Sequence, residues 1–253
     1  MKDYHFEPLS QYRVTSNNVL ALSSRHCYPI HINIEIIASE LLRYKKTKGV
    51  GVNAILTKTI ASVIKENPKF SRLNSVLKRG FFTNRLMLAH HVSFSVAQDK
   101  VYGDEKVASV YILENADQKT LQEIDKELKR SQEMKLEELP IYGQLKFFVF
   151  IPHFLQKILF FIFSLFPSKK AVTFGSVGFT NLGKSQIELM TPVTPKTIFF
   201  GIGGLRDQLF LEDEKAKSRK VFTLNMMLNH YVVDGKICSE FLSEVKRKLE
   251  TLC

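Results

Sequence analysis

The stretch FTLNMMLNHYVVDG, residues 222–235, is the most informative part of this 253-residue chain. Apolar and polar residues alternate through its first half, which is the period-2 pattern of a strand with one buried face. His230 falls on the apolar side of the alternation, and Asp234 and Gly235 follow in a turn. We therefore expect a strand that ends in an inward-facing, partly desolvated histidine, as a general base near neutral pH requires.

The His-x-x-x-Asp-Gly pattern also suggests roles for the two residues of the turn. Asp234 is expected to hold the turn through an ion pair or backbone hydrogen bonds, and Gly235 to adopt backbone angles that other residues avoid. The alternative is a core histidine beside an ordinary turn. Residue frequencies alone would produce this pattern in about a few per cent of chains of this length, so the choice depends on other motifs.

A second group of motifs stands about fifty residues upstream. It consists of GFTNLG at residues 178–183, TPVTP at residues 191–195 and TIFFGIGG at residues 197–204. This order resembles the catalytic domain of the dihydrolipoyl acyltransferases of 2-oxo acid dehydrogenase complexes, which are relatives of chloramphenicol acetyltransferase. The resemblance favours a catalytic histidine over a core histidine at position 230.

Earlier segments extend the resemblance to nearly the whole chain. Residues 9–13 resemble the family's opening segment, residues 53–68 its early helix, and residues 116–128 its long surface helix. The resemblance implies the coenzyme A-dependent acyltransferase fold, of the α/β class (an α+β two-layer sandwich), with a mixed β-sheet covered by helices. We expect residues 1–253 to form a single catalytic domain with an apolar helical insertion at about residues 140–170.

Hydrophobic periodicity predicts the same class. Strands are expected at residues 30–37, 88–97, 107–113, 172–179, 197–202 and 221–228, and helices at residues 53–66, 117–135 and 236–250. The second helix is expected to begin at a cap formed by Asn115 or Asp117 and to stop at Pro140. In the last helix, apolar residues recur every four positions and predict one stripe that packs against the sheet.

The resemblance implies acyl transfer between coenzyme A, with acyl-CoA as a substrate, and a thiol or other small nucleophile. His230 would take the proton of the incoming thiol, so that the thiolate attacks a thioester carbonyl. Thr180 stands where the family has a serine, and its hydroxyl would bind the oxyanion of the tetrahedral intermediate. Asn181 follows it and would support the site.

The resemblance assigns two further supporting residues and shows one departure. Arg13 would pair with the Asp234 carboxylate and stiffen the histidine turn, in which Gly235 also takes part. The family usually carries Asp-His-Arg before its Asp-Gly, whereas Asn229 and Tyr231 flank the histidine here. A catalytically silent trimeric scaffold is therefore one alternative to an enzyme, and a membrane-docking module of the same fold is another.

Family members assemble as trimers in which the histidine of one subunit faces a channel completed by its neighbour, so the resemblance implies a homotrimer. No lipoyl domain precedes the core in this sequence, and we expect the acyl partner on another, lipoyl-bearing chain or as a small thiol. The net charge of +11 is spread along the chain without a nucleic-acid-binding module, so nucleic acid is not an expected partner.

Three cysteines stand far apart in the sequence, with no metal-ligand spacing and no even disulfide set. No metal site is expected from them. The N-terminus lacks the apolar stretch of a secretion signal. Together these features predict a cytoplasmic protein, free or at the inner face of a membrane.

Residues 145–166 form the most apolar segment, with sixteen apolar residues in twenty-two. On one continuous helix its polar residues would form a narrow stripe made of Lys146, His153, Lys157 and Ser164. A central lysine costs about 2.5–3.5 kcal/mol in a membrane-spanning helix. Three interpretations remain: a segment lying on a membrane, with Lys169 and Lys170 near anionic headgroups, burial against another subunit, or a membrane span.

Overall fold

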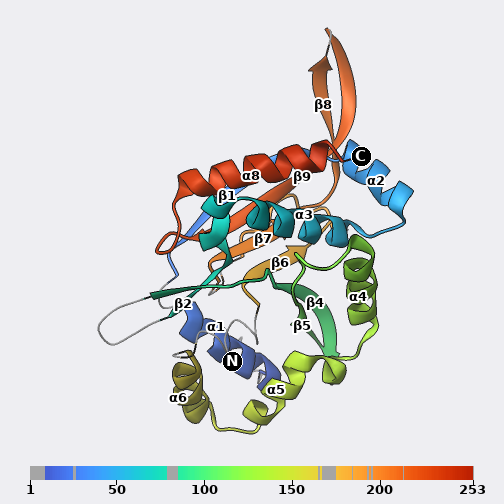
Figure 1. The fold of residues 1–253 in the computed structure, drawn as a ribbon. Helices are drawn as coiled ribbons and strands as arrows, with labels where there is room; N and C mark the ends of the chain where they lie inside the picture. The colour runs from blue at the N-terminus through green and yellow to red at the C-terminus, as the bar shows by residue number, and fades with distance from the viewer. Residues whose placement is uncertain are drawn as a thin grey trace, which may run out of the picture.

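The computed structural model describes residues 9–24, 27–78, 85–164, 166, 175–183, 185–192, 194, 196–212 and 214–252. Its centre is a mixed seven-stranded sheet with the order β1-β9-β7-β6-β4-β5, and β8 pairs with β9 outside this path (Figure 1). The strands of this sheet are β1 (Pro29–Ile37), β4 (Phe94–Tyr102), β5 (Glu105–Leu113), β6 (Val177–Asn181), β7 (Ile198–Ile202), β8 (Arg206–Glu212) and β9 (Lys215–Asn229). A short antiparallel pair consists of β2 (Ser75–Lys78) and β3 (Arg85–Leu88).

Helices cover the sheet, which confirms the predicted fold class. They are α1 (Gln11–Ser24), α2 (Ser39–Lys48), α3 (Val52–Glu66), α4 (Leu121–Glu133), α5 (Pro140–Val149), α6 (His153–Ser164) and α8 (Gly235–Glu250), with 3-10 turns η1 (Pro68–Asn74) and η2 (Leu136–Glu138). α3 and α8 lie together on one face of the sheet (Figure 1). α1, α5 and α6 gather at the end of the molecule opposite the β8–β9 hairpin (Figure 1).

The core forms where β9 meets α8, as the two periodicities predict. One face of β9 packs into this core through Phe222, Leu224, Met226 and Leu228. Asn225, Met227 and Asn229 on the opposite face are buried as well, so the expectation of a single buried face is wrong for this half of the strand. The stripe of α8 packs against this core through Cys238, Phe241, Val245 and Leu249, all fully buried. The Phe241 ring centroid lies 5.2 Å from that of Phe70 and 6.0 Å from that of Phe200. Truncating such a phenylalanine to alanine typically costs about 3–5 kcal/mol, so this contact fixes the helix on the sheet.

Two strand predictions need correction. The last long strand begins at Lys215 rather than near residue 221, because its first half pairs with β8 in a hairpin that the sequence analysis missed. The strand expected at residues 88–97 is divided between β3 and β4, with residues 89–93 outside any strand. Residues 172–174 of another expected strand lie outside the described residues. The start of the last strand was misplaced because hydrophobic periodicity within one segment does not show which other strand that segment pairs with in a hairpin.

The cap of α4 also differs from the prediction. Its N-cap is Thr120, and not Asn115 or Asp117. The Thr120 hydroxyl accepts from the Glu123 amide at 3.2 Å, while the Glu123 carboxylate accepts from the Thr120 amide at 2.7 Å. This capping box satisfies two amides that would otherwise lack partners. Asp117 instead accepts from the Val92 amide at 2.7 Å.

The apolar segment is not one continuous helix. Pro140, expected to stop α4, begins α5, and the chain leaves the helix again between Phe150 and Pro152 before α6 starts. Proline has no amide hydrogen and disfavours helical angles in the residue before it, so the break is expected at this point. The single polar stripe predicted across residues 146–164 is therefore wrong. Lys169 and Lys170 lie outside the described residues.

None of the helices in the described ranges combines the length and apolar character needed to cross a bilayer.

Candidate functional site

His230 lies in the turn between β9 and α8. Its backbone amide donates to the Tyr28 carbonyl at 2.9 Å. The ring Nδ1 lies 3.1 Å from the Val233 carbonyl oxygen and 3.7 Å from Oδ1 of Asp234. Because a carbonyl oxygen can only accept, this contact assigns the hydrogen of the neutral imidazole to Nδ1. Nε2 is then the basic nitrogen, as proton abstraction from a thiol requires.

The histidine does not face inward in a single chain. Its side chain is 48 % exposed. The amides of Val232 and Val233 both donate to the Asn229 carbonyl, so the chain turns away from the sheet one residue before the alternation would bury the imidazole. The expectation of a desolvated, inward-facing histidine is therefore wrong at the level of one chain, and the ring lies at the surface beside the end of the sheet.

Asp234 lies 3.7 Å from the imidazole within the turn, which is compatible with its predicted role, whereas Gly235 differs from its predicted role. Asp234 occupies the N-cap position of α8 without a side-chain capping bond, and its carboxylate is mostly exposed. Gly235 is the first residue of α8, does not have a positive φ, and would place a Cβ in open space. The expectation that Gly235 supplies backbone angles unavailable to other residues is wrong, because the helix begins one residue earlier than predicted.

Asn229 positions the histidine turn, a role that the sequence analysis missed. Its Oδ1 accepts from the backbone amides of Tyr28 and Tyr231, each at 3.2 Å. Together with the bond from the His230 amide to the Tyr28 carbonyl, this joins the start of β1 to the residues on both sides of the imidazole. The aspartate that the resemblance leads one to expect here would offer the same acceptor, which is the signal that could have identified the role.

Thr180 lies near the end of β6 and is 7 % exposed. Its hydroxyl has no hydrogen-bond partner in the described part of the chain. The next residue, Asn181, donates to Oδ1 of Asn53 at 2.5 Å and accepts from the Gly183 amide at 2.6 Å. Asn181 thereby ties the segment after Thr180 to the beginning of α3, which fits its predicted supporting role.

Thr180 and His230 are far apart in one chain. Register places Thr180 opposite Gly201 on β7, and Gly201 opposite Asn225 on β9. His230 follows five residues later, about 16 Å along the strand direction, and two strand spacings add about 10 Å sideways. The two residues are therefore roughly 19 Å apart, too far to act on the same carbonyl group within one chain.

Arg13 does not pair with Asp234 in the single chain. It joins α1 to β5 through an ion pair with Glu105, with its Nε 2.6 Å from the Glu105 Oε1. A hydrogen bond from Ser10 and then those from Arg13 hold the pKa of Glu105 below its usual value. β5 and β9 are separated by three strands of the sheet, which explains why the predicted partner is out of reach.

Cys238, one turn into α8, is not an alternative nucleophile. Burial, and secondarily the nearby Asp234 carboxylate, raise the pKa of its thiol to about 12. Thiolates, and not thiols, are the reactive species. The side chain is fully buried, so it serves as part of the core.

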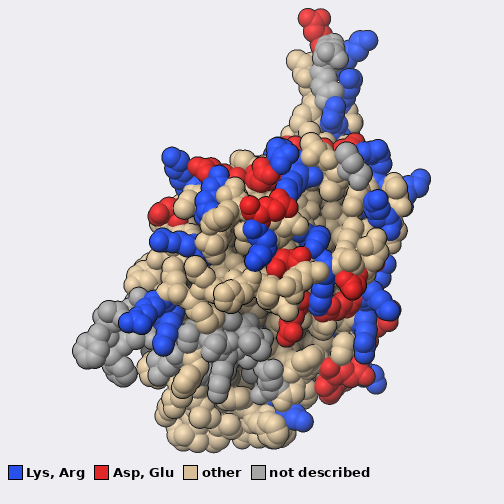
Figure 2. All heavy atoms as spheres, in the orientation of Figure 1, with Lys and Arg blue, Asp and Glu red and all other residues tan. Residues whose placement is uncertain are grey.

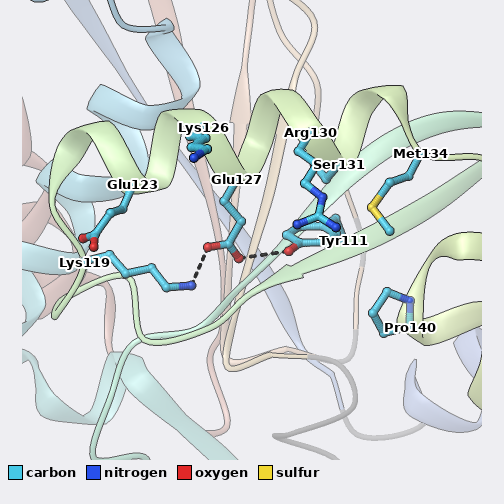
Figure 3. Close-up of a pocket in the computed structure, with 9 residues that line it drawn as sticks. All are labelled: Tyr111, Lys119, Glu123, Lys126, Glu127, Arg130, Ser131, Met134 and Pro140. Carbon is cyan, nitrogen blue, oxygen red and sulfur yellow. Dashed lines mark hydrogen bonds and ion pairs between the residues drawn. The ribbon is translucent and has the colours of Figure 1, made fainter.

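A hollow of about 530 Å³ lies along α4 (Figure 3). It is beside β5 at one edge of the sheet, whereas the histidine turn follows β9, which is next to the strand at the other edge. Lys119 pairs with the Glu127 carboxylate, which also accepts from the Tyr111 hydroxyl at 3.0 Å (Figure 3). Burial, followed by the Glu127 charge, raises the pKa of Tyr111 to about 12. None of the predicted site residues lines this hollow, and two of its charged groups, Lys119 and Glu127, pair with each other.

The mixed sheet, with a histidine directly after β9 and an aspartate at the start of the last helix, is compatible with the fold that the resemblance implies. Residues 168–252, about a third of the chain, match the family described as 2-oxoacid dehydrogenases acyltransferase (catalytic domain). The resemblance predicted from the sequence is thereby confirmed, in sequence over the C-terminal third and in fold over the whole chain.

Solved structures support the assignment of the fold. A probable dihydrolipoamide acetyltransferase from Listeria monocytogenes is 17 % identical with a TM-score of 0.68, covering 100 % of this chain and 97 % of that chain. Dihydrolipoamide acetyltransferase from Azotobacter vinelandii is 18 % identical with a TM-score of 0.72, covering 98 % and 92 %. Chloramphenicol acetyltransferase is 11 % identical with a TM-score of 0.51, covering 97 % and 98 %. No curated protein matches the chain.

Proposed function

We propose that this protein is an acyltransferase that moves an acyl group between coenzyme A and a thiol or comparable small nucleophile. The observation that carries the proposal is the fixed tautomer of His230. The Val233 carbonyl holds Nδ1, and Nε2 is left as a base at the surface beside the end of the sheet. The Asp234 carboxylate, 3.7 Å from Nδ1, would stabilise the imidazolium that forms when Nε2 takes a proton.

His230 and Thr180 have separate tasks in the proposed reaction. Nε2 of His230 removes the proton from the incoming thiol, and the thiolate forms a bond to the carbonyl carbon of the acyl thioester. The resulting oxyanion receives a hydrogen bond from the Thr180 hydroxyl, whose donor is not engaged elsewhere in the described chain. The intermediate collapses, the original carbon–sulfur bond breaks, and the imidazolium returns its proton to the departing thiolate.

A homotrimer is part of the proposal. Because Thr180 and His230 are roughly 19 Å apart in one chain, a complete site needs the threonine of one copy and the histidine of another. The Azotobacter vinelandii structure was studied for a serine, a histidine and an asparagine in catalysis, and its histidine and asparagine lie four positions apart, like His230 and Asp234. Another structure with this fold, at a TM-score of 0.73, is the cubic core of the pyruvate dehydrogenase multienzyme complex.

The acyl acceptor or donor opposite coenzyme A is proposed to be a lipoyl group on a partner chain or a small free thiol. Both present the sulfhydryl that the His230 base would deprotonate. Asn229 and Asn181 act as positioning residues in this scheme, since each holds a backbone segment next to one of the two reacting side chains.

The test is acyl transfer from short acyl-CoAs to dihydrolipoamide, measured as release of the coenzyme A thiol. His230→Ala should lower kcat at least 10²-fold, because general-base catalysis is typically worth 10²–10⁴-fold, while the thermal midpoint stays near that of the unmodified protein. His91→Ala removes a histidine that pairs with Asp117 instead, and should leave the rate unchanged. No transfer by the unmodified protein would identify a silent scaffold, and a loss of only several-fold in His230→Ala would remove this mechanism.

A further inference from the structure

The end of the molecule formed by α5 and α6 exposes an unusually apolar surface. Six of its outward side chains are Phe147, Phe150, Phe154, Ile158, Phe161 and Ile162, with Phe150 87 % exposed. These six alone expose roughly 550–900 Å² if each large side chain offers about 150–250 Å² when free. The largest apolar patch of a typical monomer is about 300–600 Å². Figure 2 shows this end as a largely uncharged surface.

The exposed surface belongs to a firmly packed unit. Gln156 of α6 is fully buried, and its amide nitrogen donates to the Phe148 and Ile151 carbonyls at 2.8 and 2.9 Å. Its amide oxygen accepts from Asn18 of α1 at 2.9 Å. A glutamine amide has two donor hydrogens, so both are used. One buried polar side chain thus joins α6 to the end of α5 and to α1 beneath them.

Apolar contacts strengthen the same arrangement. Phe160, one turn after Gln156, is 5 % exposed, and its ring stacks on that of Phe148 with centroids 4.7 Å apart. The inner face of α6 is therefore already occupied by these contacts. Gln156 points inward, whereas Phe154 and Phe161 point outward, so a polar side chain is buried while large apolar ones are exposed, unlike the usual pattern of a helix that lies on a protein core.

The lengths of α5 and α6 are compatible with shallow insertion into a bilayer. At about 1.5 Å per residue, the ten residues of α5 and the twelve of α6 give helices of about 15 and 18 Å. The break between them places Phe150 at the bend. Interfacial helices bury their apolar faces about 5–10 Å into the boundary between headgroups and acyl chains.

The charges of this segment indicate what kind of apolar partner covers the α5–α6 surface. Residues 139–170 contain four lysines and no acidic residue, in a chain with a net charge of +11. Lys146 and Lys157 are exposed, and no carboxylate in the described ranges pairs with either. Lys157 lies about 100° from Gln156 around α6, at the border between its inner and outer faces. Cations at the border of an apolar face are typical of helices that bind anionic lipid.

A second copy of this chain suits the α5–α6 surface less well than an anionic membrane does. A symmetric contact would bring equivalent patches together, and with them the lysines of both copies. No acidic side chain of this segment could neutralise them. Anionic headgroups supply that charge, and the acyl chains accept the phenylalanines.

We propose that the α5–α6 surface docks on the face of an anionic membrane, with Phe147, Phe150, Phe154 and Phe161 inserted and with Lys146 and Lys157 at the headgroups. Membrane docking by this surface is a property separate from the proposed acyl transfer and does not depend on it. Docking would place the histidine turn at a fixed position relative to the bilayer.

Flotation of the full-length protein with vesicles tests the proposal. The unmodified protein should float with vesicles of phosphatidylcholine and phosphatidylserine, and more weakly with phosphatidylcholine alone. The triple variant Phe150→Ser, Phe154→Ser, Phe161→Ser should lose at least tenfold in affinity while keeping its oligomeric size. A matched control is Leu209→Ser with Leu211→Ser on β8, which removes equally exposed apolar side chains at the opposite end and should float normally.

A second variant keeps the test decisive if the serine variant does not fold. Lys146→Gln with Lys157→Gln should weaken binding to the anionic vesicles about fivefold per lysine, and raised salt should weaken the unmodified protein only partly, because the inserted side chains are not screened. Three results would overturn the proposal: no flotation of the unmodified protein, equal binding of the lysine variant, or a smaller oligomer in the serine variant. The last would show that a second copy covers the surface.

Discussion

Thr180 lies on β6 and His230 directly follows β9 of the same sheet, yet β7 lies between these two strands and the two residues are offset by five residues in register. The resulting separation of roughly 19 Å means that the hydroxyl and the imidazole can serve one reacting carbonyl only if they come from different copies of the chain. This relationship makes the proposed function testable without any structure of the assembly.

Mixing two inactive variants should restore activity. Thr180→Val and His230→Ala each lack one half of the site, but a mixed oligomer contains sites built from the intact halves. With equal amounts and random exchange, about one site in four should be complete in a cyclic assembly. The measurement is acyl transfer after the two proteins are unfolded together and refolded. Activity no higher than that of either variant alone would show that the site is not shared between copies.

The hydroxyl of Thr180, and not its methyl group, should determine turnover. Thr180→Ser keeps a donor and should retain most activity, whereas Thr180→Val keeps the shape and should lower kcat about 10²–10³-fold, the usual effect of removing one oxyanion donor. Steady-state kinetics on both variants separate the possibilities. Similar rates for the threonine and valine forms would place the donor elsewhere.

Asn229 should matter for both stability and rate because its Oδ1 accepts from the amides of Tyr28 and Tyr231. Asn229→Leu leaves both amides without this acceptor and should cost about 1–3 kcal/mol of unfolding free energy, with a lower kcat from a displaced imidazole. Asn229→Asp keeps an acceptor oxygen, so its unfolding free energy and its kcat should both be closer to those of the unmodified protein. Chemical denaturation and kinetics provide the readouts, and indistinguishable leucine and aspartate variants would refute the positioning role.

The partner of Arg13 can be identified with double-mutant cycles. Arg13→Ala combined with Glu105→Gln should show a coupling energy, whereas Arg13→Ala combined with Asp234→Asn should be additive in unfolding free energy. Coupling in the second cycle alone would restore the pairing expected from the sequence, for example across a subunit contact.

The same pair predicts a pH dependence. The pKa of Glu105 lies below its usual value in the folded state, so the unfolded chain binds its proton more readily. The stabilisation is therefore complete above the unfolded pKa and is lost as the pH falls through the folded pKa. The stability difference between the unmodified protein and Arg13→Ala should be present at neutral pH and should shrink as the pH falls below the ordinary glutamate pKa of about 4.3. A constant difference across that range would contradict the assignment.

Some features of the site are encoded in short stretches of sequence. The alternation from Phe222 to Leu228 predicts the face of β9 that packs into the core, although not the burial of its opposite face, and the spacing of Phe241, Val245 and Leu249 predicts the buried stripe of α8. Each depends on a repeat within one element, which is set by backbone geometry alone. The motif around Thr180 and the His-x-x-x-Asp-Gly pattern were enough to indicate the fold class.

Other features arise only where distant segments meet. The exposure of His230, the clamp by Asn229, the partner of Arg13 and the outward orientation of the phenylalanines around Gln156 all depend on contacts between parts of the chain far apart in sequence. Such contacts are decided by strand register, hairpin pairing and the packing of one helix on another, and a change of one residue in register would alter all of them. The sequence by itself therefore determined the apolar pattern of β9 and α8 and the candidate site residues, whereas the tertiary structure decided where those side chains point and which of them can meet in one chain.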